Sequence, residues 1–227
     1  MKLTDKWKDQ RCFIIGGGAS IPHEFGVPEK IINEVIKQNK SISLYSPYMK
    51  AIHSENVIGV NIAFELGDWV DVLFFSDKTG FYQRFEKRIN QFKNTKVCCT
   101  NLMPKDCIYI ARNKYRDWGV SKENIIWNHN AGAASISLAA KMGVSEIILL
   151  GFDQNVVNNN HHMHGRYGQR GKSRLQRTFE RQKTGWKYIA KDAKNMGIDI
   201  YNASPDSTIK HFPKVRLCEI FTDIQLK

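Results

Sequence analysis

Short apolar runs that end in glycine or in small polar residues recur along this chain, and stretches with helical periodicity separate them. Each run has the length and the residue types of a buried strand. The runs are Cys12–Ile15, Val57–Asn61, Val70–Phe75, Lys96–Thr100, Cys107–Ala111, Glu146–Gly151 and Ile198–Tyr201. Apolar residues spaced three or four apart predict helices over 31–36, 81–92, 131–142 and 175–196. Strands that alternate with helices predict an α/β fold: a Rossmann-like, mostly parallel sheet with helices on both faces.

The size and composition of the chain suit one such domain. Its 227 residues, 42% of them hydrophobic, are enough for a substantial core and too apolar for a disordered chain. We predict a single domain over residues 1–227, with the polar residues 154–171 as an inserted lid. No apolar run approaches the roughly 20 residues that span a bilayer, so we expect a cytoplasmic protein. The five cysteines, odd in number and without CxxC spacing, argue against a disulfide scaffold.

The positive charge of the chain is concentrated in one segment. The 34 Lys and Arg residues outnumber 22 Asp and Glu residues, which gives a formal net charge of +12. Between His161 and Lys194, ten basic residues face only two acidic ones, so this segment alone carries +8. Such a stretch indicates an anionic partner, which could be a phosphorylated small molecule, a nucleic acid or a membrane surface. A solvated helix face would explain the same charges.

Ligands of parallel sheets bind outside the carboxyl ends of the strands, and the end of the first strand is rich in glycine. The residues there are Gly16, Gly17, Gly18, Ala19 and Ser20. Glycines let the backbone approach a phosphate or ribose closely. A dinucleotide fingerprint is incomplete, because Ile21 stands at its third glycine position, and a Walker lysine is lacking. A mononucleotide or nucleotide-sugar site fits this loop, and a purely structural tight turn is the alternative.

Two further segments belong to the same predicted nucleotide site. Asn61 ends the second strand, and Asp153 follows the strand that precedes the polar segment. Asn130, Ala131 and Gly132 precede a helix of small residues, where free backbone amides attract anions. Capping of the helix by Asn130 alone would also explain that segment.

The polar segment supplies candidate catalytic and phosphate-binding residues. His162, His164 and Tyr167 lie close together in the sequence, and histidine is the usual general base near neutral pH. The histidines could instead hold a metal with Asp77 or Asp153, although two histidines two residues apart are a weak metal signal. An exposed loop with incidental histidines is a third interpretation. The candidate phosphate ligands are Arg166, Arg170 and Lys172.

The ordered set of these motifs resembles a known family. The motifs are Phe13–Ile21, Ile58–Asn61, Ala131–Asp153 and Ala203–Ser207. The set is similar to the small bacterial sialyltransferases that use CMP-sialic acid. A wider related group contains motility-accessory-factor glycosyltransferases and archaeal hydroxymethylpterin diphosphokinases. Uncharacterised phage-type proteins resemble the chain more closely, through Gly59–Asn61 and Leu66–Asp71.

The resemblance implies roles for the site residues. The glycine loop, Asn61 and Asn130–Gly132 would bind the nucleotide. His162 or His164 would deprotonate an acceptor hydroxyl, and Tyr167 or a nearby arginine would help the phosphate to depart. The family requires no metal for this transfer.

Two positions depart from the family pattern. Gly17 stands where the sialyltransferases carry Asn, and Ala131 stands where they carry Ser before the glycine. The lid segments do not align residue by residue, so either histidine could be the base. Nucleotide binding tolerates these changes better than specificity for CMP-sialic acid does.

We therefore predict a sialyltransferase-like glycosyltransferase that uses a CMP-sugar-like donor, a glycan acceptor and a histidine base. No cofactor is firmly implied, and a homo-oligomer is left open. One alternative is a Mg²⁺-dependent ATP diphosphokinase, in which carboxylates such as Asp77 and Asp153 hold the metal. Another is a non-catalytic phage or host binding protein with a basic anion-binding face. Nucleic-acid binding is disfavoured, because no recognition motif is present and Phe179 and Trp186 of the basic helix are predicted core residues.

Overall fold

The fold is built on one seven-stranded sheet in which every described strand pair is parallel. The computed structural model describes residues 3–100, 106–167 and 172–221, with only the backbone of 172–175. The strands are β1 (Arg11–Ile15), β2 (Asn56–Val60), β3 (Val72–Phe75), β4 (Thr95–Cys98), β5 (Ile108–Tyr109), β6 (Glu146–Leu150) and β7 (Asp199–Asn202). Their order in the sheet is β5-β4-β3-β2-β1-β6-β7. The predicted α/β, Rossmann-like class is confirmed.

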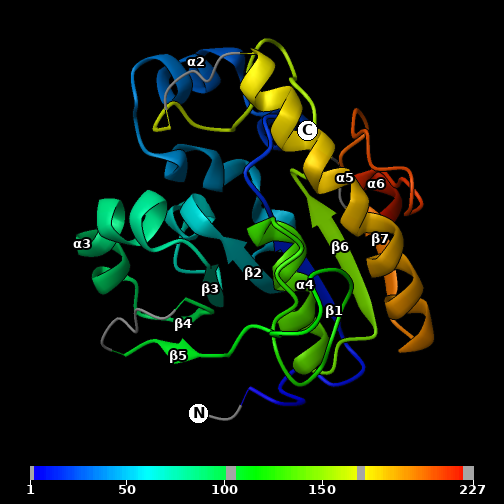
Figure 1. Ribbon diagram of the computed structural model, residues 1–227. Helices are drawn as coiled ribbons and strands as arrows, with labels where there is room; N and C mark the ends of the chain where they lie inside the picture. The colour runs from blue at the N-terminus through cyan, green and yellow to red at the C-terminus, as the bar shows by residue number, and fades with distance from the viewer. Residues whose placement is uncertain (1–2, 101–105, 168–171, 222–227) are drawn as a thin grey trace.

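Helices cover both faces of the sheet (Figure 1). The α-helices are α1 (Ile21–Glu24), α2 (Glu29–Lys37), α3 (Gln83–Gln91), α4 (Ala131–Lys141), α5 (Lys172–Asn195) and α6 (Leu217–Ile220). The 3₁₀ segments are η1 (Ile42–Tyr48), η2 (Lys50–Ile52) and η3 (Asn61–Leu66), and η4 (Lys78–Tyr82) is a π-helical turn. Within the described ranges, no helix combines the length and the apolar character needed to cross a membrane.

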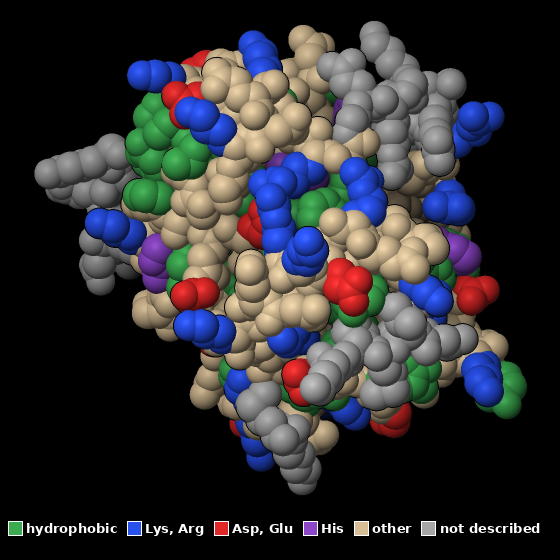
Figure 2. Space-filling model, turned by 90° about the vertical axis from the view of Figure 1, so that its left-hand side faces the viewer, with side chains coloured by type: hydrophobic (Ala, Val, Ile, Leu, Met, Phe, Trp, Pro, Cys, Tyr) green, Lys and Arg blue, Asp and Glu red, His purple; other side chains and the backbone are tan. Residues whose placement is uncertain are grey.

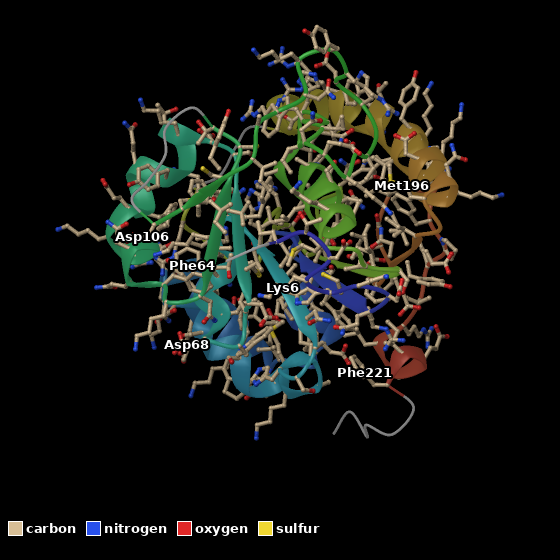
Figure 3. All side chains as sticks on the ribbon, turned by 90° about the horizontal axis from the view of Figure 1, so that it is seen from below. Lys6, Phe64, Asp68, Asp106, Met196 and Phe221 are labelled. Atoms are coloured by element: carbon tan, nitrogen blue, oxygen red, sulfur yellow. The ribbon has the colours of Figure 1, made fainter. Side chains whose placement is uncertain are left out.

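Alternating residues of β1 divide the core into two layers. Cys12 and Ile14 pack toward α4 and α5, in a layer that includes Trp186. Phe13 and Ile15 pack on the other side, with the residues of α2, α3 and η1. Figure 3 shows the two layers from below, with Phe64 of η3 and Met196 after α5 on opposite sides. Because β1 is buried on both faces, its sequence is a continuous apolar run without alternation.

The strand order changes direction between β1 and β6. From β1 the chain adds β2 to β5 on one side, and after α4 it returns so that β6 pairs with the other edge of β1. At such a switch point the connections leave in opposite directions and open a crevice outside the carboxyl ends of the strands. A ligand site is therefore expected beside Ile15 and Leu150, where the two strands end.

Three parts of the chain differ from the sequence expectation. Residues 42–52, where no element was predicted, form η1 and η2, and the side chain of Ser41 accepts a hydrogen bond from the amide of Ser43 at the start. The helix predicted over 81–92 begins earlier, as a π-helical turn that Asp77 caps by accepting from the amide of Gly80. The strand predicted over Cys107–Ala111 is limited to the two residues of the edge strand β5.

The stretch predicted as an inserted lid crosses the carboxyl edge of the sheet. Residues 154–167 are described and contain no regular helix or strand, whereas residues 168–171 lie outside the described residues. The described part runs from β6 toward α2 before α5 begins (Figure 1). There Gly165 lies against the carbonyl of Ile36 in α2, so closely that a side chain on Gly165 would clash with it.

Candidate functional site

A cleft of about 410 Å³ lies at the carboxyl edge of the sheet, beside the switch point between β1 and β6. Its volume is in the range of small-molecule sites. The predicted site residues that line it are Gly16, Gly17, Gly18, Asn61, Asn130, Ala131, Gly132, Asp153, His162, His164 and Tyr167. The predicted residues that are not among its lining are Ala19, Ser20 and Arg166. Arg170 lies outside the described residues, and only the backbone of Lys172 is described.

We call the glycine turn, residues 16–20, and the segment that follows β6, residues 151–154, the floor of the cleft. The two segments approach so closely that the amide of Gly18 donates to the carbonyl of Gly151 at 3.0 Å. A Cβ atom on Gly18 would lie 2.5 Å from that oxygen, and one on Gly16 would lie 2.8 Å from it. A Cβ atom on Gly17 would instead meet only Nδ1 of His162, at 3.3 Å. Gly16 and Gly18 are therefore needed for packing, whereas Gly17 faces the cleft.

The buried carboxylate of Asp153 joins the two segments of the floor by hydrogen bonds. Asp153 is 2% exposed and accepts hydrogen bonds from the amide of Ser20 at 3.0 Å and from the hydroxyl of Ser20 at 2.5 Å. Burial raises the pKa of this carboxyl group, and the hydrogen bonds from Ser20 oppose that rise. Since each carboxylate oxygen already accepts a hydrogen bond, Asp153 holds the glycine turn in position rather than presenting a free ligand group.

The ends of β2 and β3 carry buried polar atoms without partners. Asn61 follows β2 with φ at +52°, a conformation that Asn adopts more readily than most residues. In the described part of the chain, neither Oδ1 of Asn61 nor Oγ of Ser76, which follows β3, has a hydrogen-bond partner. Buried polar atoms are nearly always paired in folded proteins. Because both side chains line the cleft, both indicate contacts with a ligand.

The start of α4 forms one wall of the cleft. Oδ1 of Asn130 caps the helix by accepting from the amide of Gly132 at 2.8 Å and from that of Ala133 at 3.4 Å. Asn128 and His129, just before it, both have positive φ angles, a strained arrangement that recurs at functional sites. The side chain of Asn130 is thus used as a helix cap.

We call residues 161–167 the roof of the cleft, and Met163 is its anchor. The amide of Met163 donates to the carbonyl of Gly17 at 3.0 Å, and its carbonyl accepts from the hydroxyl of Tyr45 in η1 at 3.0 Å. The side chain of Met163 is fully buried. The roof is therefore fastened both to the glycine turn and to the helical layer below it.

His164 is the buried histidine of the roof, with 4% of its surface exposed. Nδ1 accepts a hydrogen bond from the amide of Arg166 at 3.2 Å, so the ring proton lies on Nε2. Burial, together with the nearby charges of His162, Arg166 and Arg84, lowers the pKa of His164 to about 3. Nε2 is buried and has no partner among the described residues. His164 is thus a neutral hydrogen-bond donor near pH 7.

His162 stacks on His164, with ring centroids 5.3 Å apart. Its Nδ1 lies 3.3 Å from the carbonyl oxygen of Gly17, which can only accept, so Nδ1 carries the proton. The lone pair of the ring is then on Nε2, the form that a general base requires. The ring of Tyr167 lies edge-on to both histidines, at 5.2 Å and 4.6 Å.

Two arginines that the sequence analysis did not single out line the cleft. Arg84 of α3 has its guanidinium 5.7 Å from the ring centre of Tyr167, and Arg181 extends from α5. On the face that carries α3, Lys and Arg side chains gather around a hollow with a histidine at its edge (Figure 2). Arg166, predicted as a phosphate ligand, instead pairs with Glu65 at 3.3 Å, and Glu65 also binds Arg88.

The carboxylates that could serve a metal are separated or already engaged. Asp77 accepts from the amide of Gly80 at 2.8 Å, and Asp153 is bound to Ser20. Across residues 3–100, 106–167 and 172–221, no three His, Cys, Asp or Glu side chains come together as a metal site.

Comparison with known proteins gives similarities of fold. The chain matches no protein-family model and no curated protein sequence. Among solved structures, it is similar to the sialyltransferase CstII from Campylobacter jejuni in complex with cytidine-5'-monophosphate, with a TM-score of 0.47 and 13% identity over 92% of this chain and 86% of that chain. CST-II in complex with a trisaccharide acceptor and CMP gives 0.47 and 14% identity, over 91% and 86%. Both TM-scores are below 0.5, so the chemistry of the cleft is derived from its own residues.

The first turns of α5 form another wall of the cleft. Trp186 is buried as predicted, but the prediction that Phe179 is a core residue is wrong, because its side chain is partly exposed and lines the cleft. α5 begins beyond the carboxyl edge of the sheet, so its first turns have no strand beneath them (Figure 1). Thr178 and Gln182 reach the cleft from the same turns.

Other residues of the cleft were assigned no role from the sequence, although the positions of two of them pointed to the site. Ser76 stands directly after a predicted strand and His161 directly before a predicted site residue, and these positions were signals. Arg84 and Gln182 lie inside helices, and no sequence pattern around them indicates a functional site. Only the packing of α3 and α5 beside the strand ends brings them to the cleft.

Proposed function

We propose that the cleft binds a nucleotide-sugar and that the protein transfers the sugar to a hydroxyl group of a glycan acceptor. One observation carries the proposal: four buried polar atoms that lack partners among the described residues converge on a cleft at the switch point of the sheet. They are Asn61 Oδ1, Ser76 Oγ, His161 Nδ1 and His164 Nε2. Each such atom costs about 1–3 kcal/mol when it stays unpaired. A ligand with several hydroxyl and phosphate oxygens would satisfy both the acceptors and the donors.

His162 is the proposed general base. Its Nε2 would take the proton of the acceptor hydroxyl while that oxygen attacks the anomeric carbon of the donor sugar. The bond from this carbon to the phosphate oxygen breaks, and its electron pair leaves with the nucleotide. The hydrogen bond from Nδ1 to the carbonyl of Gly17 keeps the ring oriented and stabilises the imidazolium that forms.

Arg84, Arg181 and Tyr167 are the proposed partners of the departing phosphate. The two arginines line the cleft, so their charges would offset the negative charge that develops on the leaving nucleotide. The phenol of Tyr167 and Nε2–H of His164 would add hydrogen bonds to the same oxygens. We propose that these donors make a metal unnecessary for the transfer.

The nucleotide itself is proposed to lie over the floor, against the amide of Gly17 and the side chain of Asn61. The amide of Gly17 has no hydrogen-bond partner among the described residues, so it is available to a phosphate or ribose oxygen. Because the strand-end motifs resemble those of enzymes that use CMP-sialic acid, CMP-linked sialic acid is the first donor to test.

Calorimetry with CMP, CDP, UDP and GDP tests the binding step, and a transfer assay with CMP-sialic acid and a panel of oligosaccharides tests the reaction. Asn61→Gly should weaken binding of the preferred nucleotide, because it removes the unpaired amide while keeping the positive φ. Asn39→Gly is the matched control, since Asn39 also has a positive φ, at +55°, is exposed and is not among the residues that line the cleft. If none of the four nucleotides binds, the proposal is rejected.

The Mg²⁺-dependent transfer of diphosphate from ATP is a rival for the same cleft. It would need carboxylates to hold the metal, but Asp77 and Asp153 already accept hydrogen bonds within the protein. Nucleotide affinity that disappears with EDTA and returns with Mg²⁺ would favour this rival.

A non-catalytic binding function is favoured by one separate feature, the exposed basic face of α5. It carries Arg177, Lys187, Lys191 and Lys194, which have no ion-pair partner among the described residues. Association with DNA or RNA that weakens steeply with salt in a mobility-shift assay would support this function.

A further inference from the structure

A chain of hydrogen bonds runs from the core to the wall of the cleft through two glutamine side chains. The indole Nε1 of Trp186 donates to Oε1 of Gln154 at 2.9 Å. Nε2 of Gln154 in turn donates to Oε1 of Gln182 at 3.1 Å. Trp186 is 1% exposed, whereas Gln154 and Gln182 both line the cleft. The three residues come from the two sides of the crevice, the segment after β6 and α5.

The indole group fixes the direction of this chain. Indole nitrogen can only donate, so the amide atom of Gln154 that faces it must be the oxygen. The other end of that amide is then an N–H donor, and the atom of Gln182 that faces it must also be an oxygen. The polar group that remains on Gln182 is its NH₂, which offers donors and no acceptor.

The backbone of Gln154 is held in the position that this chain requires. Its φ is +46°, an uncommon conformation for a residue other than glycine. The hydroxyl of Thr208 donates to the carbonyl of Gln154 at 3.0 Å, and the amide of Thr208 donates to the carbonyl of Asp153 at 2.9 Å. The loop after β7 thus clamps residues 153 and 154, and strain of this kind persists where the surroundings enforce it.

We propose that Gln182 is a specificity-determining residue of the cleft, that it selects a ligand with a hydrogen-bond acceptor at this point, and that Trp186 and Gln154 position its amide. The inference rests on the proposed function, because the ligand is taken to be a nucleotide. The acceptor is an oxygen or an unprotonated ring nitrogen, supplied either by the base or by the phosphate.

Two substitutions of Gln182 test the donor itself. In Gln182→Glu, one carboxylate oxygen still accepts from Gln154, and only the group facing the cleft changes, from a donor to an acceptor. In Gln182→Met the donor is lost without a charge. We expect the Kd of CMP to rise about fivefold in Gln182→Met, the usual effect of one hydrogen bond, and further in Gln182→Glu. Calorimetry with cytidine identifies the acceptor, because a loss shared by cytidine assigns it to the base and a loss confined to CMP assigns it to the phosphate.

One substitution of Gln154 tests the positioning. In Gln154→Glu, one carboxylate oxygen accepts from Trp186, and the other can only accept a hydrogen bond from Gln182. The side-chain amide of Gln182 must therefore rotate so that its NH₂ group faces the new carboxylate and its oxygen faces the cleft. If the acceptor is on the base, the preference for CMP over UMP falls, because the N3–H of uracil is a donor where cytosine has an acceptor. In Gln154→Met nothing orients Gln182, and CMP affinity falls less than in Gln154→Glu. NMR of the indole N–H proton of Trp186 gives a readout without ligand. Its chemical shift should differ from wild type in Gln154→Met, where the acceptor is lost, and equal that of wild type in Gln182→Met.

The outcomes separate the inference from the function on which it rests. Wild-type protein that binds neither CMP nor cytidine would reject the proposed function. Wild-type binding together with a Gln182→Met variant that binds every ligand within twofold of wild type would overturn the inference alone. Equal CMP affinities of Gln154→Glu and Gln154→Met, or an indole proton that does not respond to Gln154→Met, would overturn the positioning role.

Discussion

The floor and the roof of the cleft are built from opposite kinds of polar contact. In the floor, the protein itself uses the polar groups: Asp153 accepts two hydrogen bonds from Ser20, and Gly18 is packed against Gly151. In the roof, the backbone is anchored through Met163, while side-chain nitrogens of His161 and His164 lack partners among the described residues. The floor therefore gives the cleft its shape, and the roof supplies groups that can act on a ligand.

This difference separates residues that a sequence motif groups together. Ser20, Asp153 and Gly18 belong to the same strand-end motifs as Asn61. Ser20 is hydrogen-bonded to Asp153 and Gly18 to Gly151, whereas Oδ1 of Asn61 has no partner among the described residues. Substitution of Gly18, which is packed within the floor, should therefore change the stability of the fold, whereas substitution of His162 in the roof should change turnover. Substitution of His164, the buried histidine of the roof, should change how stability depends on pH.

The largest expected effect belongs to the roof. In His162→Asn, the side-chain amide can still donate to the carbonyl of Gly17, but no basic nitrogen remains. We expect kcat of sugar transfer to fall about 10²–10⁴-fold, the usual contribution of a general base, with CMP affinity and melting temperature unchanged. His211→Asn, at an exposed position outside the cleft, is the control. Turnover within tenfold of wild type would show that His162 is not the base.

The second prediction concerns the pH dependence that the roof imposes on stability. His164 has a pKa of about 3 in the folded protein, below its ordinary value of 6.5, so the unfolded chain binds more protons between these values. Stability should therefore fall as the solution is acidified, by about 3 kcal/mol between pH 7 and pH 4. Urea denaturation of wild type and of His164→Asn, whose side chain can still accept from the amide of Arg166, measures the difference. Parallel curves for the two proteins would refute the assignment of the slope to His164.

The third prediction compares two neighbouring glycines of the floor. Gly18→Ala places a Cβ atom 2.5 Å from the carbonyl of Gly151, so we expect it to lower the free energy of unfolding by about 1–3 kcal/mol. Gly17→Ala meets only the ring of His162 and should change stability little, while it reduces nucleotide affinity by covering the free amide. Chemical denaturation and calorimetry on both variants test the contrast, which fails if the two lose equal stability.

Much of the fold could be predicted from the sequence, because parallel strands that are buried on both faces consist of continuous apolar residues. The run Cys12–Ile15 and the glycines after it predicted a buried strand and a candidate site at its carboxyl end, where the cleft lies. The 3₁₀ segments of residues 42–52 could not be predicted, since their apolar residues follow neither a helical nor a strand period. Segments with a helical or strand period could therefore be assigned to elements from the sequence, and segments without such a period could not.

The candidate site was predictable where it follows strands and unpredictable where it depends on distant packing. Asn61 was predicted because a polar residue directly after a strand lies at the carboxyl edge. Arg166 was predicted as a phosphate ligand from its place in a basic segment, but its guanidinium is held by Glu65, a residue 101 positions earlier. The orientation of the Gln182 amide depends on a buried indole group, which no local pattern reveals.

The smallest expected effect belongs to Glu24, which lies in α1 just after the floor, and it has the opposite sign to that of His164. Glu24 ends α1, just after the glycine turn, and burial raises its pKa to about 7, helped by the charges of Asp206 and Asp153 and opposed by Arg216. Since this pKa lies above the ordinary value of 4.5, the folded protein binds more protons than the unfolded chain between pH 4.5 and 7. Stability should therefore fall as the pH rises through this range, by about 1 kcal/mol, because water screens a half-buried carboxylate.

The contribution of Glu24 can be isolated in the His164→Asn background, where the opposing slope of the roof is absent. Glu24→Gln keeps the shape of the side chain and removes the titration, so its stability should be flat between pH 5 and pH 7.5 while the parent loses stability. Denaturation curves at these two pH values are sufficient for the comparison. If Glu24→Gln retains the slope of its parent, another carboxyl group near the floor titrates in this range, and Asp153, whose pKa burial also raises, is the next residue to substitute.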